Sequence, residues 1–293
     1  MTEPTGELEL RAEDVAFSYG GRDVLGGVSL ALERRELVGV LGPNGSGKTT
    51  LVRCLMGFLA PRRGRVTLGG RDVAAWPRRQ LARHLAVVPQ EMPTDFPLLV
   101  RELVLLGRVP HLPPRGLGFE SARDRGVAEA ALADAALTEL ADRPLHQLSG
   151  GELRRAFIAR ALAQETPILL LDEPTSSLDL RHQLGILELL RRRARGGAAV
   201  LVVLHDLNLA AAYCDRIVVL AQGRVAAAGP PTAALDPAIL SDVYGVDLRA
   251  LDDAGGDRAA PGRVLIPSAR ATRRPEIRDD GAETAAKSER NLR

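Results

Sequence analysis

The sequence predicts an α/β fold in which helices flank a mostly parallel sheet, and three observations predict it. Short runs of large aliphatic residues recur at 37–41, 168–171 and 198–204, and each run ends in glycines or polar residues, as buried parallel strands do. Alternating residues near the N-terminus predict an antiparallel β subdomain. Between residues 91 and 147, prolines interrupt helical patterns, which predicts an α-helical subdomain inserted into the core.

Length and composition allow one large domain or a core with a subdomain, since the chain has 293 residues of which 45% are hydrophobic. A net charge of +2 and 3% aromatic residues give no reason to expect a nucleic-acid partner. Cys54 and Cys214 are expected to be buried and reduced. Residues 1–15 lack the apolar segment of a secretory signal, and 198–204 is far shorter than the roughly 18 residues that span a bilayer. We therefore expect a soluble, cytoplasmic protein.

The N-terminal layer is predicted from three short strands. Residues 8–19 alternate up to a Gly20-Gly21 turn, and further strands are expected at 28–32 and 65–68. The aromatic Tyr19 ends the first strand. Its position suits either stacking on a nucleotide base or packing on the core, and the residues alone leave both open.

A phosphate-binding loop is the most informative stretch. The pattern G-x-x-x-x-G-K-[ST] follows the apolar run 37–41 and precedes a helical pattern at 50–56, which is the context that the motif requires. Its glycines permit positive φ, so that successive N–H groups can face phosphate oxygens. Lys48 offers a positive charge to the β- and γ-phosphates, and Thr49 offers a hydroxyl to Mg²⁺. The residues expected to bind nucleotide here are Gly42, Pro43, Asn44, Gly45, Ser46, Gly47, Lys48, Thr49 and Thr50.

The lysine of this loop is unusual for the chain. Lys48 and Lys287 are the only lysines, and every other basic residue except histidine is arginine. A guanidinium is bulkier and more directional than an ammonium and would not fit the same narrow loop. The lysine therefore argues against a chance glycine-rich turn.

A second glycine-rich helix start lies at Ser149-Gly150-Gly151-Glu152. Ser149 and Glu152 fit a capping box, and that is a sufficient structural reason for both. Capping does not explain the two glycines, which each cost a helix roughly 1 kcal/mol relative to alanine. Because they leave the backbone bare at a helix N-terminus, we favour a second phosphate contact there.

Acidic residues follow the aliphatic run 168–171. Parallel sheets bind ligands at the carboxyl ends of their strands, so Asp172 and Glu173 are expected beside the phosphate loop. Asp172 is the expected Mg²⁺ partner, direct or through water, and Glu173 is the expected base for the attacking water. The alternative is that they only cap the next helix.

Two further polar residues end predicted strands. His205 follows 198–204 and is expected to contact the γ-phosphate, although a single histidine is more often structural. Gln90 ends a strand at 87–90, and taken alone it is a polar strand terminus. The remaining expected elements are helices at 77–86, 99–107, 121–141, 150–163, 180–195 and 230–243, strands at 217–220 and 225–228 that form a hairpin, and a last strand at 264–267.

Together these motifs resemble the nucleotide-binding subunit of ABC transporters, over about residues 8–245. The phosphate loop alone would also admit kinases, GTPases and helicases, whereas several motifs in this order are specific. The resemblance implies a P-loop NTPase core, ATP and Mg²⁺ as cofactors, and ATP hydrolysis coupled to transport. We expect an ABC ATPase domain over 1–250 with its helical subdomain at about 93–163, an extension over 251–267, and a charged, disordered tail over 268–293.

The resemblance also implies roles for single residues. Tyr19 resembles the aromatic that stacks on adenine, and Gln90 the glutamine that senses Mg²⁺ and couples to the membrane partner. Asp179 resembles the residue that communicates across a dimer, and His205 the switch histidine. Ser149, Gly150 and Gly151 resemble the signature that closes on the γ-phosphate held by another subunit.

Two departures from the family pattern are visible. Glu152 stands in place of the commoner glutamine, and Arg154-Arg155 stands where Gln-Arg is usual. Neither changes the serine and glycines of the signature. Because a phosphate loop and a signature can meet one ATP only across two subunits, the resemblance implies a head-to-tail dimer of this chain that encloses two nucleotides.

Segments 102–112 and 205–210 are similar to those of importers of iron-siderophore, haem and cobalamin. This implies integral membrane permease subunits as partners, a periplasmic or surface solute-binding protein as an indirect partner, and a peripheral location on the cytoplasmic face of the inner membrane. The alternatives are an importer ATPase for another substrate, a soluble ABC ATPase without transport, and a P-loop kinase or metabolic NTPase, which would lack the Ser149-Gly150-Gly151 element.

Overall fold

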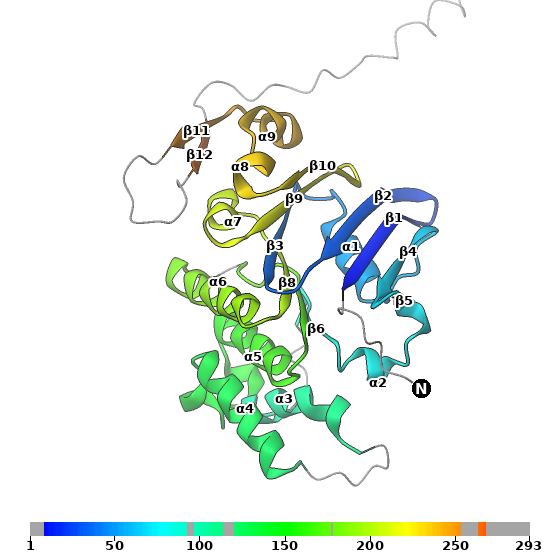
Figure 1. Ribbon diagram of the computed structural model, residues 1–293. Coiled ribbons are helices and arrows are strands. Elements are labelled where there is room, and N and C mark those ends of the chain that lie inside the picture. Colours follow the sequence, from blue (N-terminus) through cyan, green and yellow to red (C-terminus); the bar gives the residue numbers. More distant parts are fainter. Residues whose placement is uncertain (1–8, 93–96, 114–119, 177, 253–262, 268–293) are drawn as a thin grey trace, which may run out of the picture.

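A parallel sheet forms the centre of the protein. The structure, a computed structural model, describes residues 9–92, 97–113, 120–176, 178–252 and 263–267 (Figure 1). The sheet has six strands in the order β10-β9-β3-β8-β7-β6, and only β10 runs antiparallel to its neighbour. The strands are β3 (Glu36–Leu41), β6 (Leu85–Val88), β7 (Ile168–Leu171), β8 (Ala199–Val203), β9 (Arg216–Ala221) and β10 (Arg224–Gly229). The predicted α/β class is confirmed.

Both faces of this sheet are buried, which explains why its strands are continuous aliphatic runs. Alternate residues of each strand point to opposite faces. Leu169 and Val200 pack with the helices of one face, whereas Leu170 and Leu201 pack with α1 (Lys48–Leu55) and the antiparallel sheet on the other. Because successive residues face opposite sides of the sheet, the core consists of two apolar clusters, one on each face.

The N-terminal layer is a four-stranded antiparallel sheet in the order β2-β1-β4-β5. The predicted antiparallel layer is confirmed, although the sequence analysis predicted three of its strands and not the short β5. Its second strand is longer than the predicted 28–32, because pairing with β1 continues to the Gly20-Gly21 turn, where Tyr19 opposes Arg22. The strands are β1 (Leu10–Tyr19), β2 (Arg22–Leu32), β4 (Arg63–Leu68) and β5 (Arg71–Asp72).

The helical subdomain lies at one end of the sheet, at the bottom of Figure 1. The predicted helix at 121–141 ends at Asp134, because Ala136 takes a left-handed conformation with φ of 53° that no helix continues. Inside the subdomain the buried Arg108 pairs with Asp124 at 3.0 Å. Its elements are α3 (Val100–Leu105), η2 (Leu106–His111), α4 (Ala122–Asp134), η3 (Thr138–Leu140), η4 (Leu145–Gln147) and α5 (Gly150–Ala163).

The predicted helices at 77–86 and 230–243 also differ from the structure. The helix at 77–86 shrinks to α2 (Arg78–Leu81), after η1 (Val73–Ala75), because Leu85 and Ala86 are buried as part of β6 beside β7. The helix at 230–243 divides into α8 (Pro231–Ala234) and α9 (Pro237–Tyr244). Pro237 begins a new helix with Asp236 as its N-cap, since a proline cannot donate to a preceding turn.

The C-terminal part packs over the α7 side of the sheet. The predicted strand at 264–267 is β12 (Arg263–Pro267), which pairs with β11 (Leu248–Asp252), a strand that the sequence analysis did not predict. The other helices are α6 (Leu180–Arg195) and α7 (Leu207–Tyr213). The predicted tail at 268–293 lies outside the described residues.

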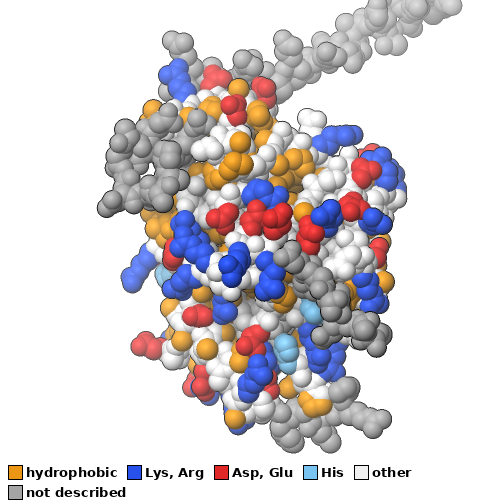
Figure 2. Space-filling view, in the orientation of Figure 1, with side chains coloured by type: hydrophobic (Ala, Val, Ile, Leu, Met, Phe, Trp, Pro, Cys, Tyr) orange, Lys and Arg blue, Asp and Glu red, His pale blue; other side chains and the backbone are white. Residues whose placement is uncertain are grey.

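The surface carries charges of both signs, and both cysteines are buried, as the composition led us to expect. Acidic and basic side chains lie side by side across the middle of the face shown in Figure 2. Cys54 and Cys214 are buried and unpaired, as predicted, and burial raises their thiol pKa values to about 11 and about 12. Among the described helices, none has the length and hydrophobicity needed to cross a bilayer.

Candidate functional site

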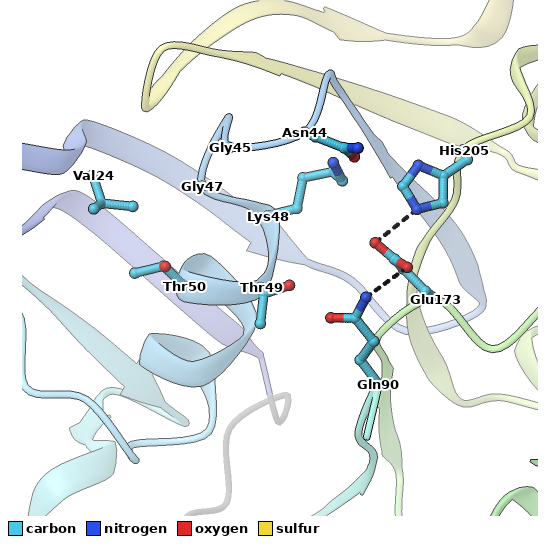
Figure 3. A pocket seen from close by; sticks show the side chains of 10 residues that line it. All are labelled: Val24, Asn44, Gly45, Gly47, Lys48, Thr49, Thr50, Gln90, Glu173 and His205. Carbon is cyan, nitrogen blue, oxygen red and sulfur yellow. Dashed lines mark hydrogen bonds and ion pairs between the residues drawn. The ribbon is translucent and has the colours of Figure 1, made fainter. Parts of the chain in front are cut away.

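The polar motifs that follow β3, β6, β7 and β8 meet at one edge of the parallel sheet, as expected for the carboxyl ends of parallel strands. They surround an open cavity of about 510 Å³ (Figure 3). The phosphate loop and α1 form one side, and Glu173, His205 and Gln90 form the other. The lining residues are Val24, Asn44, Gly45, Gly47, Lys48, Thr49, Thr50, Gln90, Glu173 and His205.

The shape of the phosphate loop depends on its glycines. Gly42 has φ of 147°, and a Cβ there would lie 2.2 Å from the carbonyl oxygen of Leu220. Gly47, the N-cap of α1, has φ of 102°, and a Cβ there would lie 2.8 Å from the Leu25 side chain. No other residue fits either position without moving the backbone. Neighbouring strands therefore fix the loop before any ligand arrives, and its following helix points its N-terminus at the cavity.

Lys48 is held inside this loop. Its side-chain ammonium donates to the carbonyl oxygens of Gly42 at 2.8 Å and Pro43 at 3.0 Å. An ammonium has three donors, so one remains for a ligand. Burial lowers the Lys48 pKa, and the nearby charges of Glu173 and Asp172 oppose that shift. The loop therefore carries a preformed positive charge at the cavity wall.

Asp172 has the properties of a cation ligand. It is 3% exposed, its Oδ1 has no hydrogen-bond partner among the described residues, and the Thr49 hydroxyl donates to its carboxylate. Burial raises the Asp172 pKa, because an ionised carboxylate without compensation is costly there. An oxygen-seeking cation such as Mg²⁺ would relieve that cost, and it needs few protein ligands when phosphates and water supply the rest. Asp172 and Thr49 thus fit the ion that the sequence predicted.

Glu173 is held from both sides. Its Oε1 lies 2.7 Å from Nε2 of His205, and its Oε2 accepts a hydrogen bond of 2.8 Å from Nε2 of Gln90 (Figure 3). The side chain is 12% exposed, so it remains in reach of water. Its backbone has φ of 52°, which is unusual for a residue with a side chain. A carboxylate fixed in this way beside a phosphate site can accept a proton from water.

Other predicted residues do not line the cavity. Ser149 and Gly150 are exposed at the start of α5, and the predicted capping box forms: Ser149 Oγ accepts from the Glu152 amide at 3.3 Å, while Glu152 accepts from the Ser149 amide at 2.8 Å. Gly151 is half-buried in the same turn. The exposed Asp179 caps α6 by accepting from the His182 amide at 2.9 Å.

Tyr19 is 44% exposed and packs edge-to-face on Phe17 at 4.8 Å, so both alternatives of the sequence analysis stay open. The sequence analysis missed Val24, which lines the cavity and, as an apolar strand residue, gives no signal of function. It mentioned Arg154 only as a departure from a pattern. The Arg154 guanidinium in fact contacts the backbone of Glu173.

Comparisons with known proteins agree with this geometry. The family model described as ABC transporter matches residues 25–176. The hemin import ATP-binding protein HmuV of Pseudomonas putida is 50% identical over 244 residues, which cover 82% of this chain and 93% of that protein. A solved structure of a metal-chelate type ABC transporter in an inward-facing conformation has a TM-score of 0.76 at 27% identity, covering 90% of this chain and 98% of that one.

A dimeric bacterial ABC transporter cassette has a TM-score of 0.67 at 29% identity, covering 76% of this chain and 98% of that one. The family match spans the phosphate loop and both acidic residues after β7. The order of the motifs, the cavity that they form and these similarities agree. The chain belongs to the ABC transporter family and carries its ATP-binding, ATP-hydrolysing domain.

Proposed function

We propose that this chain is the ATP-hydrolysing subunit of an importer that takes up haem or a related iron chelate. For hydrolysis, the supporting observation is the carboxylate of Glu173, held by His205 and Gln90 opposite the phosphate loop. For the cargo, it is the likeness to a hemin import ATP-binding protein over 82% of the chain.

Several residues of the cavity each have their own role in ATP hydrolysis. The loop amides and the free donor of Lys48 bind the β- and γ-phosphates. Mg²⁺ neutralises phosphate charge when it is bound, and Thr49 and Asp172 would hold it, with Gln90 nearby. Glu173 accepts the proton of the attacking water, and His205 orients Glu173 and contacts the γ-phosphate. Tyr19 stacks on the adenine, which extends the site beyond the cavity described above.

The site needs a second copy of this chain. Ser149, Gly150 and Gly151 lie outside the cavity and are accessible, so they can contact the nucleotide of another copy paired head to tail. We assign Asp179, which is also exposed, to the same interface. A cassette of similar fold that is dimeric supports pairing of two copies.

Coupling to transport needs a membrane partner. We place the dimer on the cytoplasmic face of the inner membrane, bound to integral membrane permease subunits that receive cargo from a solute-binding protein. Gln90 follows β6 of the core and precedes α3 of the helical subdomain in the chain, so it can transmit a change at the nucleotide to the permease.

Co-purification from membranes followed by reconstitution tests this function. A tagged chain is expected to recover a polytopic permease, and ATP hydrolysis by the reconstituted complex is expected to rise with haem-loaded solute-binding protein. Stimulation only by a siderophore or cobalamin would reject haem as the cargo. Recovery of ribosomal proteins instead of a permease would reject transport altogether.

A further inference from the structure

Arg154, near the start of α5, contacts the backbone of Glu173, the proposed catalytic base, and of Gln90. Its Nη1 donates to the carbonyl oxygen of Glu173, and its Nη2 lies 3.5 Å from the carbonyl oxygen of Gln90. The side chains of Glu173 and Gln90 are themselves hydrogen-bonded at 2.8 Å. One guanidinium therefore contacts the main chain of the two residues that form the wall opposite the phosphate loop.

The backbone of Glu173 needs such support. A residue with a side chain at φ of 52° costs on the order of 1–3 kcal/mol and persists only where its surroundings hold it. The Glu173 carbonyl also accepts from the Ser176 hydroxyl at 3.0 Å, but a hydrogen bond from a charged donor is about twice as strong as a neutral one. Arg154 thus supplies the strongest of these contacts.

Arg154 is not a solvated surface charge. Burial lowers its pKa, and the negative charges of Glu173 and Asp172 oppose the shift. A partly buried guanidinium that faces two acids of an ATP site is costly unless its donors are used. Its donors point toward the backbone carbonyls of Glu173 and Gln90. Arg154 is therefore suited to setting the position of Glu173.

Farther along α5, two side chains hydrogen-bond to the outer edge of β6. Arg160 Nη2 donates to the carbonyl oxygen of Val87 at 3.4 Å, and Gln164 Nε2 to that of Leu85 at 3.0 Å. In the part of the chain that the structure describes, β6 is the last strand of the parallel sheet, so these carbonyls have no strand partner on that side. A movement of α5 would therefore act on the β6 edge and, through Arg154, on Glu173.

We propose that Arg154 is a positioning residue that links the start of α5 to Glu173 in the same chain. The inference rests on the head-to-tail dimer of the proposed function. When Ser149, Gly150 and Gly151 close on the nucleotide of the second copy, α5 is fixed, and Arg154 then fixes the backbone of its own Glu173. Each chain thereby senses the nucleotide of its partner before it hydrolyses its own.

The variant Arg154→Gln tests this link, because the glutamine amide is uncharged and too short to contact the carbonyl oxygens of both Glu173 and Gln90. We expect kcat to fall between about tenfold and about a hundredfold, as for a small misplacement of a catalytic group, with KM for ATP within about twofold and with reduced cooperativity in ATP. Arg154→Lys keeps the charge and is expected to recover only part of kcat. The matched control is Arg155→Gln, since Arg155 contacts the carbonyls of Ala135 and Ala136 instead.

A double-mutant cycle separates positioning from general stability. If Arg154 acts through Glu173, adding Arg154→Gln to Glu173→Gln causes no further loss in single-turnover hydrolysis. Losses that multiply, or an unchanged kcat in Arg154→Gln, would overturn the inference. Dimerisation of Glu173→Gln with MgATP is measured in parallel: if that dimer forms, a negative result concerns Arg154 alone, and if it does not form, the proposed function fails first.

Discussion

The phosphate loop and the start of α5 are both glycine-rich helix N-termini, but their glycines have different causes. At Gly42 a Cβ would lie 2.2 Å from a carbonyl of the same chain, and at Gly47 it would lie 2.8 Å from a neighbouring leucine. At Gly151 it would lie 2.9 Å from the Leu178 side chain, whereas at Gly150 it would meet no atom of the described residues within 4 Å, so the contrast concerns Gly150. The chain itself requires Gly42 and Gly47 of the loop, whereas Gly150 has no such requirement within the described part of one copy.

The difference extends to the polar residues. Lys48 and Asp172 are 5% and 3% exposed, and each is surrounded by groups of its own chain. Ser149 is exposed, and its side chain bonds to Glu152 within the capping box. In a site shared by two copies, the buried charges around Lys48 would form one half, and the open backbone at the start of α5 would form the other. In the proposed dimer, one half of the site would be complete in the monomer and the other half would be directed outward.

The largest expected effect comes from the preorganised half. Glu173→Gln removes the proton acceptor but keeps the size of the side chain and a partner for His205 and Gln90. We expect kcat to fall by about 10²–10⁴, the range that a positioned general base contributes. Phosphate release from MgATP measures it, with nucleotide binding as the control. A variant that hydrolyses ATP at the normal rate would remove Glu173 from the reaction.

The next effect concerns the outward half. Gly150→Val places a side chain in space that is empty in one copy, so the free energy of unfolding should stay within about 0.5 kcal/mol of the original. If the partner's phosphates approach this backbone, hydrolysis should fall by about 10²-fold, as when one transition-state donor is lost. Thermal unfolding and ATPase rates are measured on the same sample. Full activity in a folded variant would break the comparison.

The sequence predicted features that depend on neighbouring residues and missed features that depend on residues far apart in the chain. The phosphate loop and the residues after each strand were predictable, because their chemistry lies in short local patterns. The break of α4 before Ala136 was not, since alanine gives no local sign of a left-handed conformation. Nor was the contact of Arg154 with Glu173 and Gln90, which joins residues 19 and 64 positions apart.

Asp172→Asn tests the buried charge. Because burial raises the Asp172 pKa in the folded chain, stability without nucleotide increases as pH falls through that pKa and decreases as pH rises through it. Removing the charge should therefore raise Tm at neutral pH by roughly 2–4 °C, which corresponds to about 1 kcal/mol. The variant should also lose the extra stabilisation that Mg²⁺ adds to bound ATP. A lower Tm without nucleotide would contradict the assignment.

The smallest effect is expected at Tyr19. Stacking of a base on an aromatic contributes about 1–3 kcal/mol, so Tyr19→Ala should raise KM for ATP by about tenfold with little change in kcat. Tyr19→Phe keeps the ring and should match the original within about twofold. Equal KM values in all three proteins would assign Tyr19 to packing on Phe17 instead.

The central claim is that the two glycine-rich helix starts meet across two copies of this chain. Light scattering of Glu173→Gln with MgATP tests it most directly, because slow hydrolysis traps the closed state. We expect twice the mass of one chain with MgATP, the mass of one chain without nucleotide, and no dimer when Gly150→Val is added. A Glu173→Gln chain that binds MgATP and remains monomeric would contradict the account.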